Sequence, residues 1–236
     1  MKKELGKYGF EIVVIFIGIT ASFIFEEWRQ GREKQENANN IMNSLIVELE
    51  RNDEYIKSAD TTYVYIDSLI TACLKGDNIK NEDVMNLTYS LLEEVSYYQL
   101  KDVSSFVYGF SSLDPVIILK KNEDIITYMS YLNSLLSEHQ NITSHIYDQS
   151  SKDLWPLLRK YEINEDLINY LRTEPPEDSL IFVGKDQHYA DLMRDDKFRE
   201  HISWSQLKIM RLSDINNAIH RRIKDINEAL KTAIEE

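Results

Sequence analysis

Apolar and small side chains recur at alternating spacings of three and four residues over a long stretch of this chain, from Ile41 to Leu74. This spacing places them along one face of a helix, so it predicts a single helix over that stretch. Asn52 is the one interruption, and Gly76–Asn78 end the pattern. A core-facing helix of a bundle and a self-associating coiled coil both carry such a stripe. We favour the bundle, because later segments can cover the stripe. The residues that form this apolar stripe are Leu45, Leu49, Ile56, Ala59, Tyr63, Ile66, Ile70 and Cys73.

The composition agrees with long helices. Seven Gly and four Pro among 236 residues supply few turns, whereas an all-β fold needs many. Hydrophobic residues make up 43% of the chain, enough to form a core. The single cysteine, Cys73, excludes an intrachain disulfide and a Cys-based zinc site. The net charge of -13 argues against nucleic-acid binding, because an acidic surface repels phosphates.

Further helices are predicted along the rest of the chain. Asn122 and Asn164 each precede two acidic residues, which is a typical helix start. Ser179–Gly184 is the only strand-like run, and it has no evident partner strand. The helices that we expect span about 81–98, 103–111, 122–155, 164–172 and 205–236.

A charge-free run, Ile12–Phe25, is rich in Ile, Val and Phe. A helix from Tyr8 to Trp28 would be roughly 30 Å long, close to the thickness of a bilayer core. These two aromatic residues bracket the run as interfacial anchors do. A cleaved signal peptide is the competing interpretation, but apolar residues directly follow the small residues Thr20–Ser22. We therefore favour an uncleaved membrane anchor.

The predicted fold class is all-α, with one N-terminal transmembrane helix continuing into an antiparallel bundle of long helices. We expect a short cytoplasmic N-terminus (1–7), a transmembrane anchor (8–28), a polar helical stalk (29–40) and a soluble helical bundle (41–236). Three Lys or Arg lie close to the anchor on each side, so their count does not set the orientation. The free amino group favours the N-terminal side as the cytoplasmic one.

Glu11 is an ionisable residue near the start of the anchor. It lies near one helical face with Gly18 and Ser22, a small-x-x-x-small pair, so these three residues could contact another membrane helix. In the simpler interpretation, Glu11 sits at the bilayer edge, where the helix dipole and Lys7 stabilise its charge. We favour the edge position, because a charge there costs far less than at mid-bilayer.

The anchor resembles a family of single-pass bacterial membrane proteins of unknown function. The family motif has the form Gly-Glu-Ile, then Gly-Ile, then a Trp after the span, and Phe10 stands where its first Gly would be. A second block, residues 110–132, is similar to the family's central segment, although 113–115 replace its usual Gly turn. The resemblance implies a place in the bacterial inner membrane and no particular chemistry. The matching motif residues are Glu11, Ile12, Gly18, Ile19 and Trp28.

No catalytic motif stands out. The five histidines show neither His-Glu-x-x-His nor Glu-x-x-His spacing, and Gly-x-Ser-x-Gly and phosphate-binding loops are missing. His139 lies on an apolar stripe, which is typical of a core histidine. We therefore expect no catalytic residue, no cofactor and no metal.

These features together favour a non-enzymatic, membrane-anchored helical interaction protein of the bacterial cell envelope, with its bundle in the periplasm. Its partners would be the lipid bilayer and either its own copies or another envelope protein. The alternative is a homo-oligomeric membrane assembly, a pore or an ion-responsive core, with Glu11, Gly18 and Ser22 at the helix interface. An envelope enzyme is the third and least favoured hypothesis.

Overall fold

The computed structural model describes residues 2–76, 79–95, 100, 103, 123–172 and 186–235, with most side chains described from Ile15 onward. Every regular element in these ranges is a helix, so the predicted all-α class is confirmed. The elements are α1 (Lys2–Lys75), α2 (Asn81–Tyr89), the π-helix η1 (Ser90–Glu94), α6 (Glu123–Lys160), α7 (Asn164–Arg172), α8 (Asp186–Arg194) and α9 (Asp196–Glu235).

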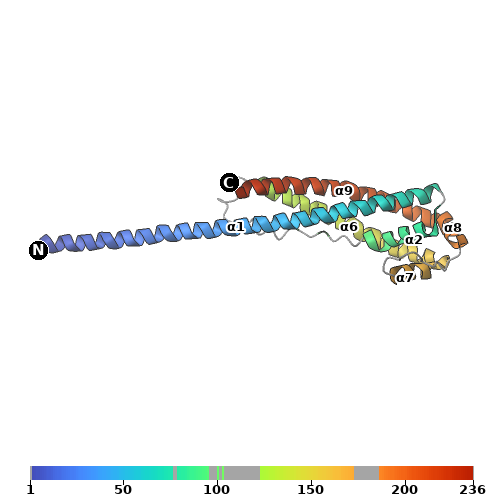
Figure 1. The fold of residues 1–236 in the computed structure, drawn as a ribbon, viewed down its shortest axis with the longest axis horizontal. Helices are drawn as coiled ribbons and strands as arrows, with labels where there is room; N and C mark the ends of the chain where they lie inside the picture. Colours follow the sequence, from blue (N-terminus) through green and yellow to red (C-terminus); the bar gives the residue numbers. More distant parts are fainter. Residues whose placement is uncertain are drawn as a thin grey trace.

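α1 is one continuous helix of 74 residues, about 110 Å long at 1.5 Å per residue. Its N-terminal half projects beyond the rest of the molecule (Figure 1). No residue from Ile15 to Asn37 is buried, and Ala38 is the first that is. We therefore divide α1 into a projecting segment (2–37) and a bundle segment (38–75).

The bundle segment of α1 lies beside α6 and α9, the two other long helices (Figure 1). It packs closely against α9 and meets α6 through buried side chains, such as Tyr63 against His139. α9 contacts both partners and runs antiparallel to α1, since Gln206 bonds to Asp67 whereas His220, further along α9, contacts Asp53. The short helices α2, α7 and α8 gather at the end of the bundle far from the projecting segment. We call that end the tip, and the opposite end the base.

Two clusters of buried apolar side chains hold the three long helices together. The base cluster joins α1 around Leu45 and Leu49 to α6 around Leu132 and to α9 around Ile219. The tip cluster joins the end of α1 to α2, η1, α7 and α8 as well as to α6 and α9. All eight members of the predicted α1 stripe are buried in these clusters. The stripe is therefore the core-facing side of a bundle helix, as predicted.

Local sequence explains where the helices begin and end at the tip. Gly76 follows α1 with a φ of 73°, a left-handed conformation that glycine adopts without strain. The Arg199 guanidinium donates to the Leu74 carbonyl at 2.7 Å, which satisfies an acceptor at the end of α1. Asp195 precedes α9, and its Oδ1 accepts from the backbone N–H groups of Lys197 and Phe198. Asp195 is thus the N-cap of the longest helix after α1.

The contact between α1 and α9 carries a regular set of polar bonds. Three aspartates of α1, Asp53, Asp60 and Asp67, are seven residues apart and so share one face. Asn216 donates to Asp60 at 2.8 Å, Gln206 donates to Asp67 at 2.8 Å, and His220 Nδ1 contacts Asp53. A one-turn slip would break all three bonds, so they fix the register of the two helices.

Several boundaries differ from the sequence prediction. α6 continues past Pro156 to Lys160, although proline removes the N–H that would bond the Lys152 carbonyl. α9 begins at Asp196, not near 205, and α8 was not predicted at all. The second helix changes to π geometry at Ser90. The predicted strand at 179–184 and most of the predicted helix at 103–111 lie outside the described residues.

Candidate functional site

The predicted contact residues all lie on the projecting segment of α1. Tyr8 and Glu11 are on its helical backbone, with side chains outside the described set. Gly18 is open, with no atom within 4 Å of the position that a Cβ would occupy. The Ser22 hydroxyl donates to the Gly18 carbonyl at 2.8 Å. The structure thus places Gly18 and Ser22 together on one helix face, and Trp28 lies further along the same helix.

The described side chains from Ile15 to Phe25 present an almost purely hydrocarbon surface. The large apolar ones are exposed on every side of the helix, by 52% to 71%. Both hydroxyls of this stretch bond within the helix, because Thr20 donates to the Phe16 carbonyl in the same way as Ser22 does to Gly18. Among the helices that the structure describes, none combines the length and the apolar character of a bilayer-crossing segment. The exposed residues are Ile15, Phe16, Ile17, Ile19, Phe23, Ile24 and Phe25.

Trp28 lies where the apolar surface gives way to a charged one, directly after Glu26 and Glu27. Its ring lies 5.8 Å from that of Phe25 on one side, and the Arg32 guanidinium lies 5.1 Å from its centre on the other. Arg29 then forms ion pairs with Glu26 at 2.8 Å and with Glu33 at 2.6 Å. One turn of helix therefore separates a hydrocarbon surface from a charged one.

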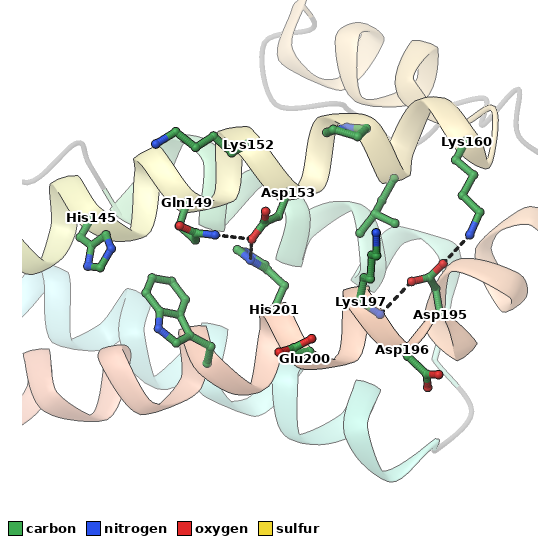
Figure 2. Close-up of a pocket in the computed structure, with 13 residues that line it drawn as sticks. His145, Gln149, Lys152, Asp153, Lys160, Asp195, Asp196, Lys197, Glu200 and His201 are labelled. Atoms are coloured by element: carbon green, nitrogen blue, oxygen red, sulfur yellow. Dashed lines mark hydrogen bonds and ion pairs between the residues drawn. The ribbon is translucent and has the colours of Figure 1, made fainter.

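A second candidate region is an open groove of ≈ 920 Å³ between α6 and α9 near the tip (Figure 2). Its lining includes side chains of both charges and the Trp204 ring. Across it, the Lys160 ammonium contacts the Asp195 carboxylate at 2.6 Å, and the Tyr161 hydroxyl donates to the same oxygen at 2.7 Å. The bond from Lys160 is the main reason that the pKa of Asp195 falls to about 2. This end of the groove is therefore closed by a tight ionic contact.

Ser150, His201 and Asp153 meet beside this groove. His201 Nδ1 lies 3.1 Å from Asp153 Oδ2, and His201 Nε2 lies 3.1 Å from Ser150 Oγ (Figure 2 shows the His–Asp contact). This order of bonds is that of a Ser-His-Asp catalytic triad. Ser150, however, is 0% exposed, so no substrate can reach its hydroxyl in this conformation. We therefore assign the three residues to the packing of α6 against α9.

Each pair of long helices shares at least one histidine contact, and α6 and α9 share a second one, the edge-on packing of His145 against Trp204 with ring centres 5.3 Å apart. His139 of α6 is hydrogen-bonded to the Tyr63 hydroxyl of α1 at 3.2 Å. His201 of α9 bonds to Asp153 and Ser150 of α6, and His220 of α9 contacts Asp53 of α1. Burial lowers the pKa of His139 to about 4, and burial also lowers the pKa of His201 although Asp153 opposes it. The expected core position of His139 is confirmed.

Sequence reasoning missed both the groove and the His201 contact. The partners of His201 are 48 and 51 residues away in the sequence, so no local motif marks them. The only local signal is that Ser150 and Asp153 are three residues apart and so share a helix face. Within the described ranges, no group of three or more His, Cys, Asp or Glu side chains could hold a metal ion.

Comparison with known proteins does not identify the chain. No protein-family model, no curated protein and no solved structure matches it. The resemblance of its anchor to single-pass bacterial membrane proteins therefore stays a prediction from the sequence.

Proposed function

We propose that this protein is a membrane-anchored helical interaction protein, held in the bilayer by the start of α1. The observation that carries the proposal is the surface of the projecting segment. Apolar side chains exposed on every side of a helix have no face to offer to one protein neighbour, whereas lipid surrounds a helix completely. The two hydroxyls in the stretch bond to carbonyls of their own helix, as they must where water is absent.

The ends of the apolar run support the same proposal. The charge-free run begins at Ile12, before the first described side chain, so the full stretch is longer than its described part. Tyr8 and Trp28 lie roughly 30 Å apart along the helix, as interfacial aromatics on the two sides of a bilayer would. The ion pairs of Arg29 follow at once, where water would be available.

A continuous α1 would then support the bundle above the membrane. About 70 Å of helix separates Trp28 from the end of α1 at 1.5 Å per residue. The tip and its groove would face a partner at that height, either a second copy or another envelope protein. In this proposal residues 1–7 lie in the cytoplasm of a bacterium and the bundle lies in the periplasm.

The anchor is tested by a pair of arginine substitutions at equally exposed apolar positions. Ile17 is 61% exposed on the projecting segment, and Val47 is 56% exposed on the bundle segment. An arginine near the middle of a membrane helix costs about 3 kcal/mol of insertion free energy, so Ile17→Arg should shift the protein from the membrane fraction to the soluble fraction. Val47→Arg should leave the distribution unchanged. Equal distributions for both variants would contradict the anchor.

The interaction part is tested by crosslinking in native membranes. We expect a discrete crosslinked species, either an oligomer of this chain or a complex with one other protein. A chain that stays monomeric, with no crosslinked partner at several crosslinker lengths, would contradict it.

The alternative is a homo-oligomeric assembly in which Glu11, Gly18 and Ser22 meet the same face of a neighbouring copy. The open space at Gly18 favours it, because a second helix can approach closely there. Gly18→Leu should reduce the oligomer size in mild detergent, whereas Gly31→Leu, at an equally open glycine beyond the apolar run, should not. Glu11→Gln should alter oligomer size or ion flux, and no change in either would remove this alternative.

A further inference from the structure

We propose that α6 is an acid-sensitive helix of the bundle: on acidification it separates from α1 and α9, while these two helices stay paired. The histidine contacts differ in a way that points to this behaviour. The two histidines that are hydrogen-bonded between α6 and another long helix, His139 to α1 and His201 to α9, are buried. His145 of α6 is exposed, and its ring packs edge-on against that of Trp204 of α9. The contact of α1 with α9 involves the exposed His220 and a carboxylate. The inference concerns the bundle alone and does not depend on the membrane anchor.

His139 has no group that could stabilise a positive charge. From α1 it meets the Tyr63 hydroxyl at 3.2 Å, and its Nδ1 is buried without a partner among the described residues. No charged side chain contributes to the shift of its pKa, which burial alone lowers to about 4. Protonation would therefore leave an unpaired cation in the core between α1 and α6, which favours any conformation that exposes the ring to water.

His201 is held in a similar position against α6. It meets Asp153 and Ser150 from α6, and Ser205 and Trp204 from its own helix. Asp153 is the one charged group that acts on it, and this carboxylate lies partly in solvent. Burial lowers the pKa of His201 in spite of that carboxylate. His201 therefore also binds a proton more tightly in the open bundle, where α6 has moved away, than in the closed one.

The contact between α1 and α9 contains a carboxylate where the His139 contact contains only a hydroxyl. His220 Nδ1 contacts Asp53, which also forms an ion pair with Lys57 at 2.6 Å. Burial opposes ionisation of Asp53, but the hydrogen bonds from Lys57 and His220 outweigh it and lower its pKa. Asp60, the next acid on this face, has its pKa raised by burial above the ordinary 3.8. When it is protonated, its carbonyl oxygen can still accept the hydrogen bond from Asn216, so we expect the α1–α9 pair to keep this bond.

The pH window follows from the sign of the shifts. A histidine whose pKa is lower in the closed bundle binds its proton more readily in the open one, so the closed state loses stability as the pH falls. The loss begins near the ordinary pKa of 6.5 and continues to about 4, the pKa of buried His139. Within this window His139 raises the ratio of open to closed molecules about 10-fold per pH unit, and His201 adds to the rise in the same direction.

The test measures the three distances between the long helices in the full chain in detergent. Spin labels are attached to cysteines at the exposed positions Thr61 of α1, Ser137 of α6 and Leu207 of α9, in pairs, in a Cys73→Ser background. Between pH 6.5 and 4 we expect the 61–137 and 137–207 distance distributions to broaden and the 61–207 distribution to stay narrow. If all three broaden together, or if none changes, the proposal is overturned.

A pair of histidine variants tests the cause. His139→Gln removes one titrating group, so the rise in the ratio of open to closed molecules should be about 10-fold smaller per pH unit than in the unmodified chain. His145→Gln replaces the exposed histidine of the same helix, whose ring packs against Trp204 of α9, and should leave the dependence on the two buried histidines in place. NMR of the His139 ring in the unmodified chain gives a readout that needs no variant. Protonation of His139 outside the pH range of the distance changes would also overturn the proposal.

Discussion

The two segments of α1 share one continuous helical backbone and have opposite surfaces. In the bundle segment apolar side chains form a stripe, so that Ile66 is 0% exposed while charged residues face solvent. In the projecting segment apolar side chains surround the helix, and Ile19 is 52% exposed. Helix geometry is the same in both, so the distribution of apolar residues around the axis decides what each segment contacts. A stripe requires one protein face, and an all-round apolar surface requires an apolar medium.

The two segments also satisfy their polar groups differently. Thr20 and Ser22 of the projecting segment donate to carbonyls of their own helix. In the bundle segment, Asp60 and Asp67 accept from amide side chains of α9. In the projecting segment, hydrogen bonds within the helix satisfy the two hydroxyls without another chain segment. In the bundle segment, hydrogen bonds to α9 fix the register of the two helices.

Truncation of an apolar side chain should give the largest difference in stability between the two segments. Leu49→Ala removes a fully buried side chain of the base cluster and should lower the free energy of unfolding by about 2–5 kcal/mol. Ile19→Ala, at an exposed position of the projecting segment, should leave it nearly unchanged. Urea denaturation of the full chain in detergent measures both. Similar losses for the two variants would mean that the projecting segment also packs against protein.

An intermediate effect is expected at Asp195, the N-cap of α9. Asp195→Ala should cost about 1–2 kcal/mol of unfolding free energy, because two backbone donors lose their acceptor. Asp195→Asn keeps an acceptor for the cap and should cost less.

The same residue gives a test by pH. The pKa of Asp195 is lowered to about 2 in the folded protein, so its stabilising effect is complete above the ordinary 3.8 and is lost as the pH falls towards 2. The unfolding free energy of Asp195→Asn should lack this part of the acid dependence. An unchanged acid profile in the variant would contradict the assigned contact with Lys160.

The smallest effect is expected at Arg29 on the projecting segment. Its ion pairs with Glu26 and Glu33 lie on an exposed helix surface, where such pairs contribute little to stability. Arg29→Ala should therefore leave the urea midpoint within experimental error. A clear loss of stability would indicate that this part of α1 packs against another protein segment.

The sequence predicts the long helices well, because their apolar spacing is sustained over many turns. All eight residues of the α1 stripe are buried as expected. α8 was missed because it buries only Tyr189 and Leu192 and lacks the Asn with two following acids that marks the start of the equally short α7. Its place depends on a distant contact, the bond of the Tyr189 hydroxyl to Asp166 of α7. A bond between residues 23 positions apart leaves no periodic signal in the sequence.

The candidate sites also differ in whether a local sequence pattern reveals them. Gly18 and Ser22 could be predicted because they share a face of a single helix. The groove between α6 and α9 could not, since Asp153 and His201 meet only after two helices have packed. Contacts between helices depend on register, which here is fixed by bonds such as Asn216 to Asp60 that no local pattern reveals.

The central claim, which rests on the proposed anchor, is that one helix passes from lipid into water along its length. Spin labels at 17, 24, 34 and 64 of the full chain in lipid vesicles test it directly, through collision with oxygen and with a water-soluble nickel complex. We predict that labels at 17 and 24 collide mainly with oxygen, which dissolves in the bilayer, and that labels at 34 and 64 collide mainly with nickel. Nickel accessibility at 17 and 24 equal to that at 34 would contradict the account.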